Sequence, residues 1–331
     1  MPTTQIRSEL IVDALQVACR APSLHNTQPW RWVLTDHGVE LFADPSRHAR
    51  SADSSGRQAV ISCGAALHHF RVAMAAAGWD TTVRRFPDAE DPLHLATVEF
   101  TPSPSISEDQ KRLADAILAR RTDRLPLAEP SEVENLLDAL NTDDDHGGTV
   151  SFDLVAEELR SALAEASSLT DTVRLHDSDY HNELFWWTEQ LVSNDGIPLS
   201  ALISAPESDR VDVGRTFPVI RHPERRTEIG EDRSRILVIS SADDSPESVL
   251  RCGEALSRAL LEATIAGYAT CTLTHLTELP SGRDVVASLI DGDAIPQVLI
   301  RVGLAPALEA APPPTPRRHI RDVVEIRRGS T

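Results

Sequence analysis

Lysine is almost absent from this chain of 331 residues: Lys111 is the single lysine, and nearly all basic side chains are arginines. Schiff-base chemistry, which needs a lysine amine at the reacting centre, therefore has no ready candidate. Cysteine is scarce too, with four residues and neither a Cys-x-x-Cys pair nor a zinc-type spacing. This usage is typical of free, mostly buried thiols in a reducing cytosol. The histidines also lack partners at metal-ligand spacing, so we expect no metal site.

Long apolar runs are missing as well. The first ten residues lack the apolar core of a signal peptide, and no run of 18 apolar residues occurs. The formal net charge of −19 disfavours binding to nucleic acid or to an anionic membrane surface. We therefore expect a cytoplasmic protein without nucleic-acid or membrane partners. Any anionic ligand must meet a local cluster of arginines.

An internal repeat is visible in residues 62–79 and 251–268, each of which reads as a long helix ending near a glycine. At a constant offset of 189 residues, six of the eighteen aligned positions are identical. Strand-like runs follow each helix, so a mixture of helix and strand occurs twice. We therefore predict an α+β fold in which one unit is duplicated and fused in one chain. The identical pairs are Cys63/Cys252, Gly64/Gly253, Ala66/Ala255, Leu67/Leu256, Ala77/Ala266 and Gly78/Gly267.

Shorter elements and two breaks complete the pattern. Strands are expected at residues 30–35, 39–43, 81–86, 94–100, 236–240, 270–274 and 297–302, and further helices at 9–20, 108–119 and 282–290. The Pro- and Ser-rich stretch 102–107 is interpreted as a linker between a first half, residues 1–105, and a second half, residues 106–331. Residues 195–233 have no counterpart in the first half and are interpreted as an insertion, because loops of this length are functional lids or disordered.

The sharpest motif is APSLHNTQPW, residues 21–30, between the first predicted helix and the first predicted strand. Two prolines pin a loop that is crowded with hydrogen-bonding side chains, as recognition of a polyol or a heterocycle requires. The alternative is a plain helix end followed by a turn. The candidate binding residues are Ser23, His25, Asn26 and Gln28.

Two basic motifs are candidates for binding a phosphate. The sequence RRTDR, residues 120–124, directly follows a predicted helix, and Arg317 and Arg318 form a doublet near the C-terminus. Guanidinium groups bind phosphate as a bidentate fork, and a hydroxyl adds one more donor. The alternative is a solvated basic helix end, which the helix dipole also favours.

Together these motifs resemble the FMN-dependent nitroreductases. The string P-S-x-x-N-x-Q-P-W resembles the family signature near the ribityl chain and ring of the flavin, and RRTDR is similar to the family's phosphate-binding R-R-S-x-R. The resemblance implies that Arg121, Thr122 and Arg124 hold the FMN phosphate, together with one or both of Arg317 and Arg318. It also implies that the loop after Gly267 runs along the flavin ring, although a plain strand is the alternative there. The residues concerned in that loop are Thr272, Leu273 and Thr274.

The motifs are divided between the two halves. Only the first half carries the P-S-x-x-N-x-Q-P-W string, and only the second carries RRTDR and the C-terminal arginines. The simplest reading is a fused pseudo-dimer with one intact FMN site and one lost site. This arrangement resembles the mycobacterial Acg family of nitroreductase-like proteins over nearly the whole chain, including HNELFWW at 181–187 and ATCTLTHLTEL at 269–279. That resemblance implies a monomer, a lid over the flavin formed by residues 195–233, and a link to dormancy.

Two functions follow from a single covered FMN site. The first is reduction of nitro compounds or quinones with NAD(P)H, in which the flavin carries the redox chemistry and no catalytic acid or nucleophile of the protein is needed. The second is FMN storage without efficient turnover, because a lid would keep a nicotinamide from stacking on the ring. A flavin-free scaffold is a third, weaker reading, because the motifs for both ring and phosphate are present.

Overall fold

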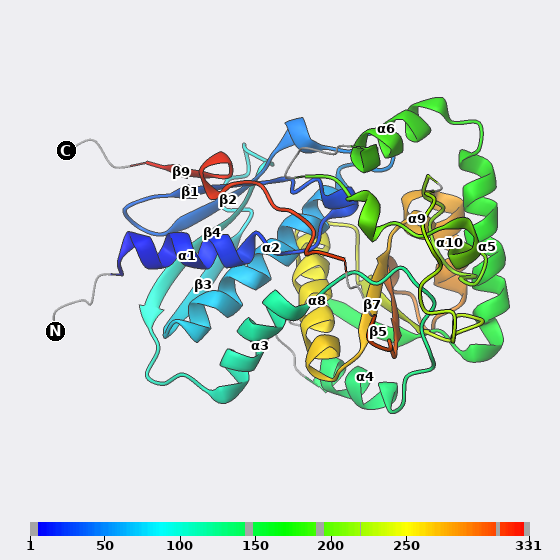
Figure 1. The fold of residues 1–331 in the computed structure, drawn as a ribbon. Helices are drawn as coiled ribbons and strands as arrows, with labels where there is room; N and C mark the ends of the chain where they lie inside the picture. The colour runs from blue at the N-terminus through cyan, green and yellow to red at the C-terminus, as the bar shows by residue number, and fades with distance from the viewer. Residues whose placement is uncertain (1–5, 143–147, 190–194, 219, 309–311, 328–331) are drawn as a thin grey trace.

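Two groups of helices and strands lie side by side, with two long helices packed between them (Figure 1). The computed structural model describes residues 6–142, 148–189, 195–218, 220–308 and 312–327. The helices are α1 Ser8–Ala18, α2 Arg57–Ala76, α3 Glu108–Ala119, α4 Val133–Thr142, α5 Arg160–Arg174, α6 Ser178–Glu189, α7 Ala205–Ser208, α8 Pro246–Ile265, α9 His275–Glu278 and α10 Pro280–Ser288. The strands are β1 Trp30–Leu34, β2 Val39–Ala43, β3 Trp79–Arg85, β4 His94–Pro102, β5 Val150–Leu154, β6 Arg235–Ser241, β7 Ala269–Leu273, β8 Ile295–Gly303 and β9 Val324–Ile326.

The two sheets have the same strand order. The first runs β3-β4-β2-β1 and the second β7-β8-β6-β5, so each strand of one sheet has a counterpart in the other. Neighbouring strands pair antiparallel in both series, and the register shifts once between β2 and β4 and once between β6 and β8. The strand β9 is added to the first sheet, parallel to β1. The C-terminal segment therefore returns from the second half of the chain to the first.

Helix α2 is buried along most of its length. Its middle is built from small and apolar residues that are buried on every side, as expected for a helix enclosed by other elements. By length and composition, this is also the one helix among the described residues that could cross a membrane, but 72% of that window is buried inside the fold. Such burial is typical of a core helix.

Helices α2 and α8 cross where each has a glycine. A Cβ atom added at Gly64 would lie 2.2 Å from the carbonyl oxygen of Leu250, and one added at Gly253 would lie 2.1 Å from that of Ile61. The contact is reciprocal, because the offset that aligns the two glycines also aligns Ile61 with Leu250. Isologous contacts of this kind are typical of a twofold relation between the contacting units. Only glycine lets the two backbones come so close.

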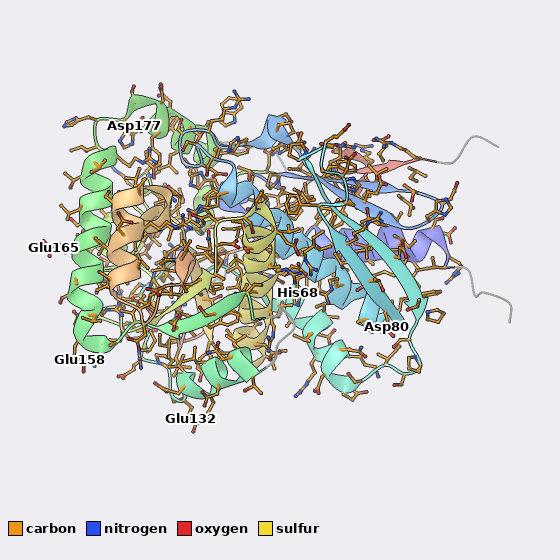
Figure 2. The ribbon with its side chains drawn as sticks, turned by 180° about the vertical axis from the view of Figure 1, so that it is seen from behind. His68, Asp80, Glu132, Glu158, Glu165 and Asp177 are labelled. Atoms are coloured by element: carbon orange, nitrogen blue, oxygen red, sulfur yellow. The ribbon has the colours of Figure 1, made fainter. Side chains whose placement is uncertain are left out.

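Polar side chains are buried beside this crossing. The Nδ1 atoms of His68 and His69 each lie 2.7 Å from the hydroxyl oxygen of Ser257 on α8. Figure 2 shows His68 in the middle of the molecule, where the two helices meet. The junction of the halves therefore contains hydrogen bonds as well as close backbone packing.

Most of the predicted elements are confirmed, with ends shifted by a few residues. Helix α3 is the helix expected at residues 108–119, and Ser107 and Gln110 form a capping box at its start. The two long helices begin earlier than expected, at Arg57 and Pro246, and Trp79 belongs to β3 rather than to the end of α2. The elements between α4 and α6, together with β9, were not predicted. All four cysteines are free and buried, as expected.

Candidate functional site

The loop that carries the first motif has an unusual backbone. Three of its non-glycine residues have left-handed φ angles: 48° at His25, 57° at Asn26 and 52° at Gln28. Each such residue costs about 1–3 kcal/mol, and such residues cluster where a ligand is held. The amide nitrogen of Asn26 stabilises the loop by donating to the carbonyl oxygens of Gly196, at 2.8 Å, and Pro316, at 3.1 Å. The loop is thus fixed by the insertion on one side and by the C-terminal segment on the other.

Gln28 supports this loop from behind. Its side chain is fully buried, and its Oε1 accepts a hydrogen bond of 2.9 Å from the backbone N–H of Arg318. The Arg318 guanidinium in turn donates to the carbonyl oxygen of Asp322, at 2.8 Å. Neither Gln28 nor Arg318 is among the residues that line the two cavities described below. Both lie next to the predicted site and hold its backbone in place.

A cavity of about 450 Å³ lies where the two halves meet, in the size range of roughly 300–1,000 Å³ that is usual for small-molecule sites. The motif loop contributes Pro22, Ser23, Leu24 and His25, helix α2 contributes Gln58, Ile61 and Ser62, and the segment 271–275 forms the opposite wall. Thr122 and Arg124 of the RRTDR motif also line it. The structure therefore brings together three motifs that are more than 90 residues apart in the sequence.

A smaller pocket of about 50 Å³ adjoins this cavity and is rich in arginine. The two pockets share the wall residues Pro22, Ser23, Thr122, Arg124 and Ile197. Among the described residues, no carboxylate forms an ion pair with any arginine of this pocket. The pocket therefore concentrates positive charge within an acidic protein. Its arginines are Arg20, Arg120, Arg121, Arg124 and Arg317.

The arginines of this pocket repel one another. Burial, and then the charges of Arg20 and Arg121, lower the pKa of Arg120 to about 10. Burial, and then the charges of Arg120 and Arg20, lower the pKa of Arg317 to about 9. Both side chains are still cationic at neutral pH, and the Nε atoms of both are buried without a hydrogen-bond partner. A phosphate would supply the missing charge and the missing acceptors.

We expect inorganic phosphate to stabilise the flavin-free protein, because phosphate relieves this repulsion only in the folded state. At concentrations well above its dissociation constant, phosphate should raise Tm by at least about 2 °C in a thermal melt. Sodium chloride at equal ionic strength should not match this shift, and Arg120→Ala should reduce it. An equal shift with chloride would mean general charge screening and would contradict a specific anion site.

Arg120 and Arg121 differ in their surroundings. Arg121, the residue selected from the motif, is exposed, and its guanidinium donates to the carbonyl oxygens of Leu118, at 2.8 Å, and Arg120, at 2.9 Å, at the end of α3. Arg120 is only 6% exposed and was not selected. Helical periodicity could have indicated that Arg120 faces inward. It follows the buried Ala116 by four residues and the buried Ile117 by three, and residues at these spacings share one face of a helix.

The strand β7 connects the wall of the cavity to the RRTDR motif. The backbone N–H of Asp123 donates to the carbonyl oxygen of Thr270, at 2.8 Å, and Thr122 forms a parallel bridge with the same residue. The predicted residues Thr272, Leu273 and Thr274, at and just after the end of β7, all line the cavity.

His25 and His275 are neutral residues of the cavity wall. Burial, followed by the charges of Arg215 and Arg124, holds the pKa of His25 well below its ordinary value, and neither ring nitrogen has a partner. Burial also lowers the pKa of His275 to about 3, and its Nε2 lies 2.8 Å from the hydroxyl of Ser167. Cys271, next to this wall, has a pKa raised by burial. These groups do not form an activated nucleophile and base.

The insertion forms much of the remaining wall. Arg215 donates hydrogen bonds to the hydroxyls of Tyr180, at 2.6 Å, and Thr274, at 3.0 Å, and it is ion-paired with Glu278. The Arg124 guanidinium lies 5.2 Å from the ring centroid of Phe217. The sequence did not indicate any individual wall residue of the insertion, because this segment has no periodic apolar pattern. Its lining residues are Ile197, Ile203, Ser208, Val211, Asp212, Gly214, Arg215, Thr216 and Phe217.

Comparison with known proteins places the chain in a family. No family model matches the sequence. A Mycobacterium tuberculosis protein named "Putative NAD(P)H nitroreductase acg" is 54% identical over 99% of this chain and 98% of its own. Two further proteins of that organism, one uncharacterised and one named as a nitroreductase, are 47% and 38% identical, each over 96% of this chain and 93% and 92% of their own.

Solved structures are more distant. The structure of a protein from Anabaena variabilis, described as a "putative nitroreductase", matches 89% of this chain and 73% of its own with 13% identity. Its TM-score of 0.46 is too low to support an argument about the fold. The sequence relatives, in contrast, match over nearly their full length. The chain therefore belongs to the Acg family of nitroreductase-like proteins.

Proposed function

We propose that the chain binds one FMN across the junction of its halves and acts as an NAD(P)H-dependent nitroreductase-type oxidoreductase. The observation that carries this proposal is the arginine pocket without carboxylate partners beside a cavity of about 450 Å³. A ring with a charged tail fits this shape, because the two spaces share five wall residues. The buried, unpartnered nitrogens of Arg120 and Arg317 supply donors for a phosphate.

The predicted site residues divide into groups with different roles. Arg120, Arg317 and Arg20 would hold the phosphate with the Thr122 hydroxyl, and Arg121 would contribute charge from the rim. Ser23, His25 and Arg124 would lie along the ring on one side, and Thr272, Leu273 and Thr274 on the other. Asn26, Gln28 and Arg318 would fix the loop that carries the first group. These assignments rest on burial, cavity lining and charge.

The proposed reaction is transfer of electrons from NAD(P)H to a nitro compound or a quinone. Two of the family members described above are named as NAD(P)H nitroreductases. When bound, FMN supplies the redox chemistry, and the protein supplies binding, orientation and control of access. Neutral His25 and His275 and the buried thiol of Cys271 agree with a site in which no side chain acts as nucleophile.

We also propose that the chain is a fused pseudo-dimer that functions as a cytoplasmic monomer. The identical strand orders and the reciprocal contact between Gly64 and Gly253 support a duplication of one unit. The single motif loop in the sequence, which lines the arginine-rich pocket, supports one site per chain. In this proposal the halves are residues 1–105 and 106–331. The strand β9 belongs to the second half in sequence but pairs with β1 in the first sheet.

In this proposal residues 195–233 act as a lid over the ring, and ion pairs attach this segment to the rest of the fold. Arg226 forms two hydrogen bonds, of 3.1 and 2.8 Å, with the carboxylate of Asp123. Asp232 is fully buried against Arg301 and Arg160. Breaking a buried ion pair by removing one partner costs about 3–5 kcal/mol. Deletion of the whole insertion would therefore damage the fold, and substitutions within residues 197–217 are the better test of a lid.

The test of the proposed reaction is anaerobic mixing of the FMN-loaded protein with NADPH while flavin absorbance is followed. We expect the flavin band to bleach within the time of catalytic turnover, and then to recover when a nitroarene or a quinone is added. No bleaching by NADPH or NADH in a protein that retains its FMN would contradict the oxidoreductase and support FMN storage instead.

A further inference from the structure

The segment 212–217 of the insertion is attached to helix α5 through alternate residues. The carboxylate of Asp212 accepts hydrogen bonds of 2.7 and 2.8 Å from Arg160. The carbonyl oxygen of Gly214 accepts a hydrogen bond of 3.2 Å from Ser167, and the hydroxyl of Thr216 donates to Asp171 at 2.6 Å. These three contacts are polar and lie on the side of the insertion that faces α5.

The segment also lines the cavity, and two of its side chains, Arg215 and Phe217, are held there in different ways. Arg215 is held there by an ion pair with Glu278 and by hydrogen bonds to Tyr180 and Thr274. Phe217 has no such polar anchor: its ring is 6.2 Å from the ring of His25, edge to face at 74°, and 5.2 Å from the Arg124 guanidinium. The Phe217 side chain also packs against the apolar cluster of Ala49, Ala52, Tyr180 and Leu184, so it is held at the cavity by aromatic, cation–π and apolar contacts without an ion pair.

The two ring contacts of Phe217 are with residues of different motifs. His25 belongs to the loop of the first half, and Arg124 belongs to RRTDR in the second. Aromatic and cation–π contacts of this kind are weaker than the ion pair that fixes Arg215, so the Phe217 ring can move while the rest of the segment stays attached to α5.

We propose that Phe217 determines which planar molecules reach the ring of a ligand bound in this cavity. With the side chain against His25 and Arg124, a nicotinamide or a nitroarene cannot stack on that ring; displacement of the side chain admits it. Phe217 is thus a specificity-determining residue, which selects by size and stacking ability. This inference rests on the proposed FMN site.

The inference is tested with FMN-loaded wild-type protein, Phe217→Ala and Phe217→Leu. Quenching of flavin fluorescence by iodide measures access to the ring without any turnover. We expect the quenching constant to rise about tenfold in Phe217→Ala, which corresponds to about 1.4 kcal/mol in favour of the open arrangement. Phe217→Leu keeps apolar bulk without a stacking ring, and we expect an intermediate rise. Reduction by NADPH should accelerate in the same order.

Phe185→Ala is the matched control, because Phe185 is 51% exposed on α6 and does not line either cavity. It should leave both measurements unchanged. The inference about access would be overturned if both Phe217 variants bound FMN fully and had the same iodide quenching constant as the wild-type protein. A wild-type protein that binds no FMN would overturn the proposed function instead. If Phe217→Ala does not fold, Phe217→Leu decides the question alone, by a rise in the quenching constant or by its absence.

Discussion

Replacing Arg120 by alanine should weaken FMN binding by about 1.5–3 kcal/mol, which is roughly a 10- to 150-fold higher Kd. Arg120 is buried in the small pocket, its Nε has no partner, and it has no carboxylate among the described residues to neutralise it. Its substitution removes a donor that we propose for the phosphate and also removes a repulsive charge from the flavin-free protein. We therefore expect lower affinity without lower stability of the flavin-free fold.

Arg121→Ala is the matched control for this prediction. Its exposed guanidinium donates to carbonyl oxygens at the end of α3, so its loss should change FMN affinity much less. Fluorescence titration of each flavin-free variant with FMN measures the two Kd values. If Arg121→Ala raised the Kd for FMN more than Arg120→Ala, Arg121 would be the arginine that binds the phosphate, as the sequence motif implies. The assignment of Arg120 from its burial in the structure would then be wrong.

Placing a methyl group at the helix crossing should strongly destabilise the fold. In Gly253→Ala the new Cβ atom would lie 2.1 Å from the carbonyl oxygen of Ile61 and 2.8 Å from the Cα atom of Gly64. Both neighbours are backbone atoms, so the clash can be relieved only by moving α2 away from α8. We expect the free energy of unfolding to fall by about 3 kcal/mol or more, measured by urea denaturation.

Gly64→Ala should behave in the same way, because its contact is the reciprocal one. Gly230→Ala is the control: an added Cβ atom there meets nothing within 4 Å, and its backbone is not left-handed. Its effect should lie within about 0.5 kcal/mol. Because the cavity lies between the halves, both crossing variants should also lose FMN. Stability near that of wild type for Gly64→Ala and Gly253→Ala would contradict the close crossing.

The repeated part of the fold could be predicted because its signals are local. The glycines and small residues of the two long helices recur at one offset, and the strands that follow have clear apolar periods. The strand β9 was missed, because its partner β1 lies almost 300 residues earlier and no local pattern indicates that pairing. The helices of residues 133–189 were missed because no equivalent segment exists in the first half to compare with them.

The loops of the candidate site could be selected from the sequence, but the orientation of their side chains could not. The motif resemblance selected loops that the structure brings to one cavity, which collects Ser23, Thr122 and Thr272 from three separate segments. It could not decide which of two adjacent arginines faces inward. That choice depends on packing: Arg120 is buried and Arg121 is not, and Arg317 lines the small pocket whereas Arg318 does not.

Isothermal titration of the flavin-free chain with FMN tests the central claim most directly. A single cavity shared by two unequal halves predicts saturable binding of one FMN per chain, with the chain sedimenting as a monomer before and after. Two FMN per chain would contradict the single site. No binding at FMN concentrations that saturate other flavoproteins would contradict the arginine pocket as a phosphate site and, with it, the proposed function.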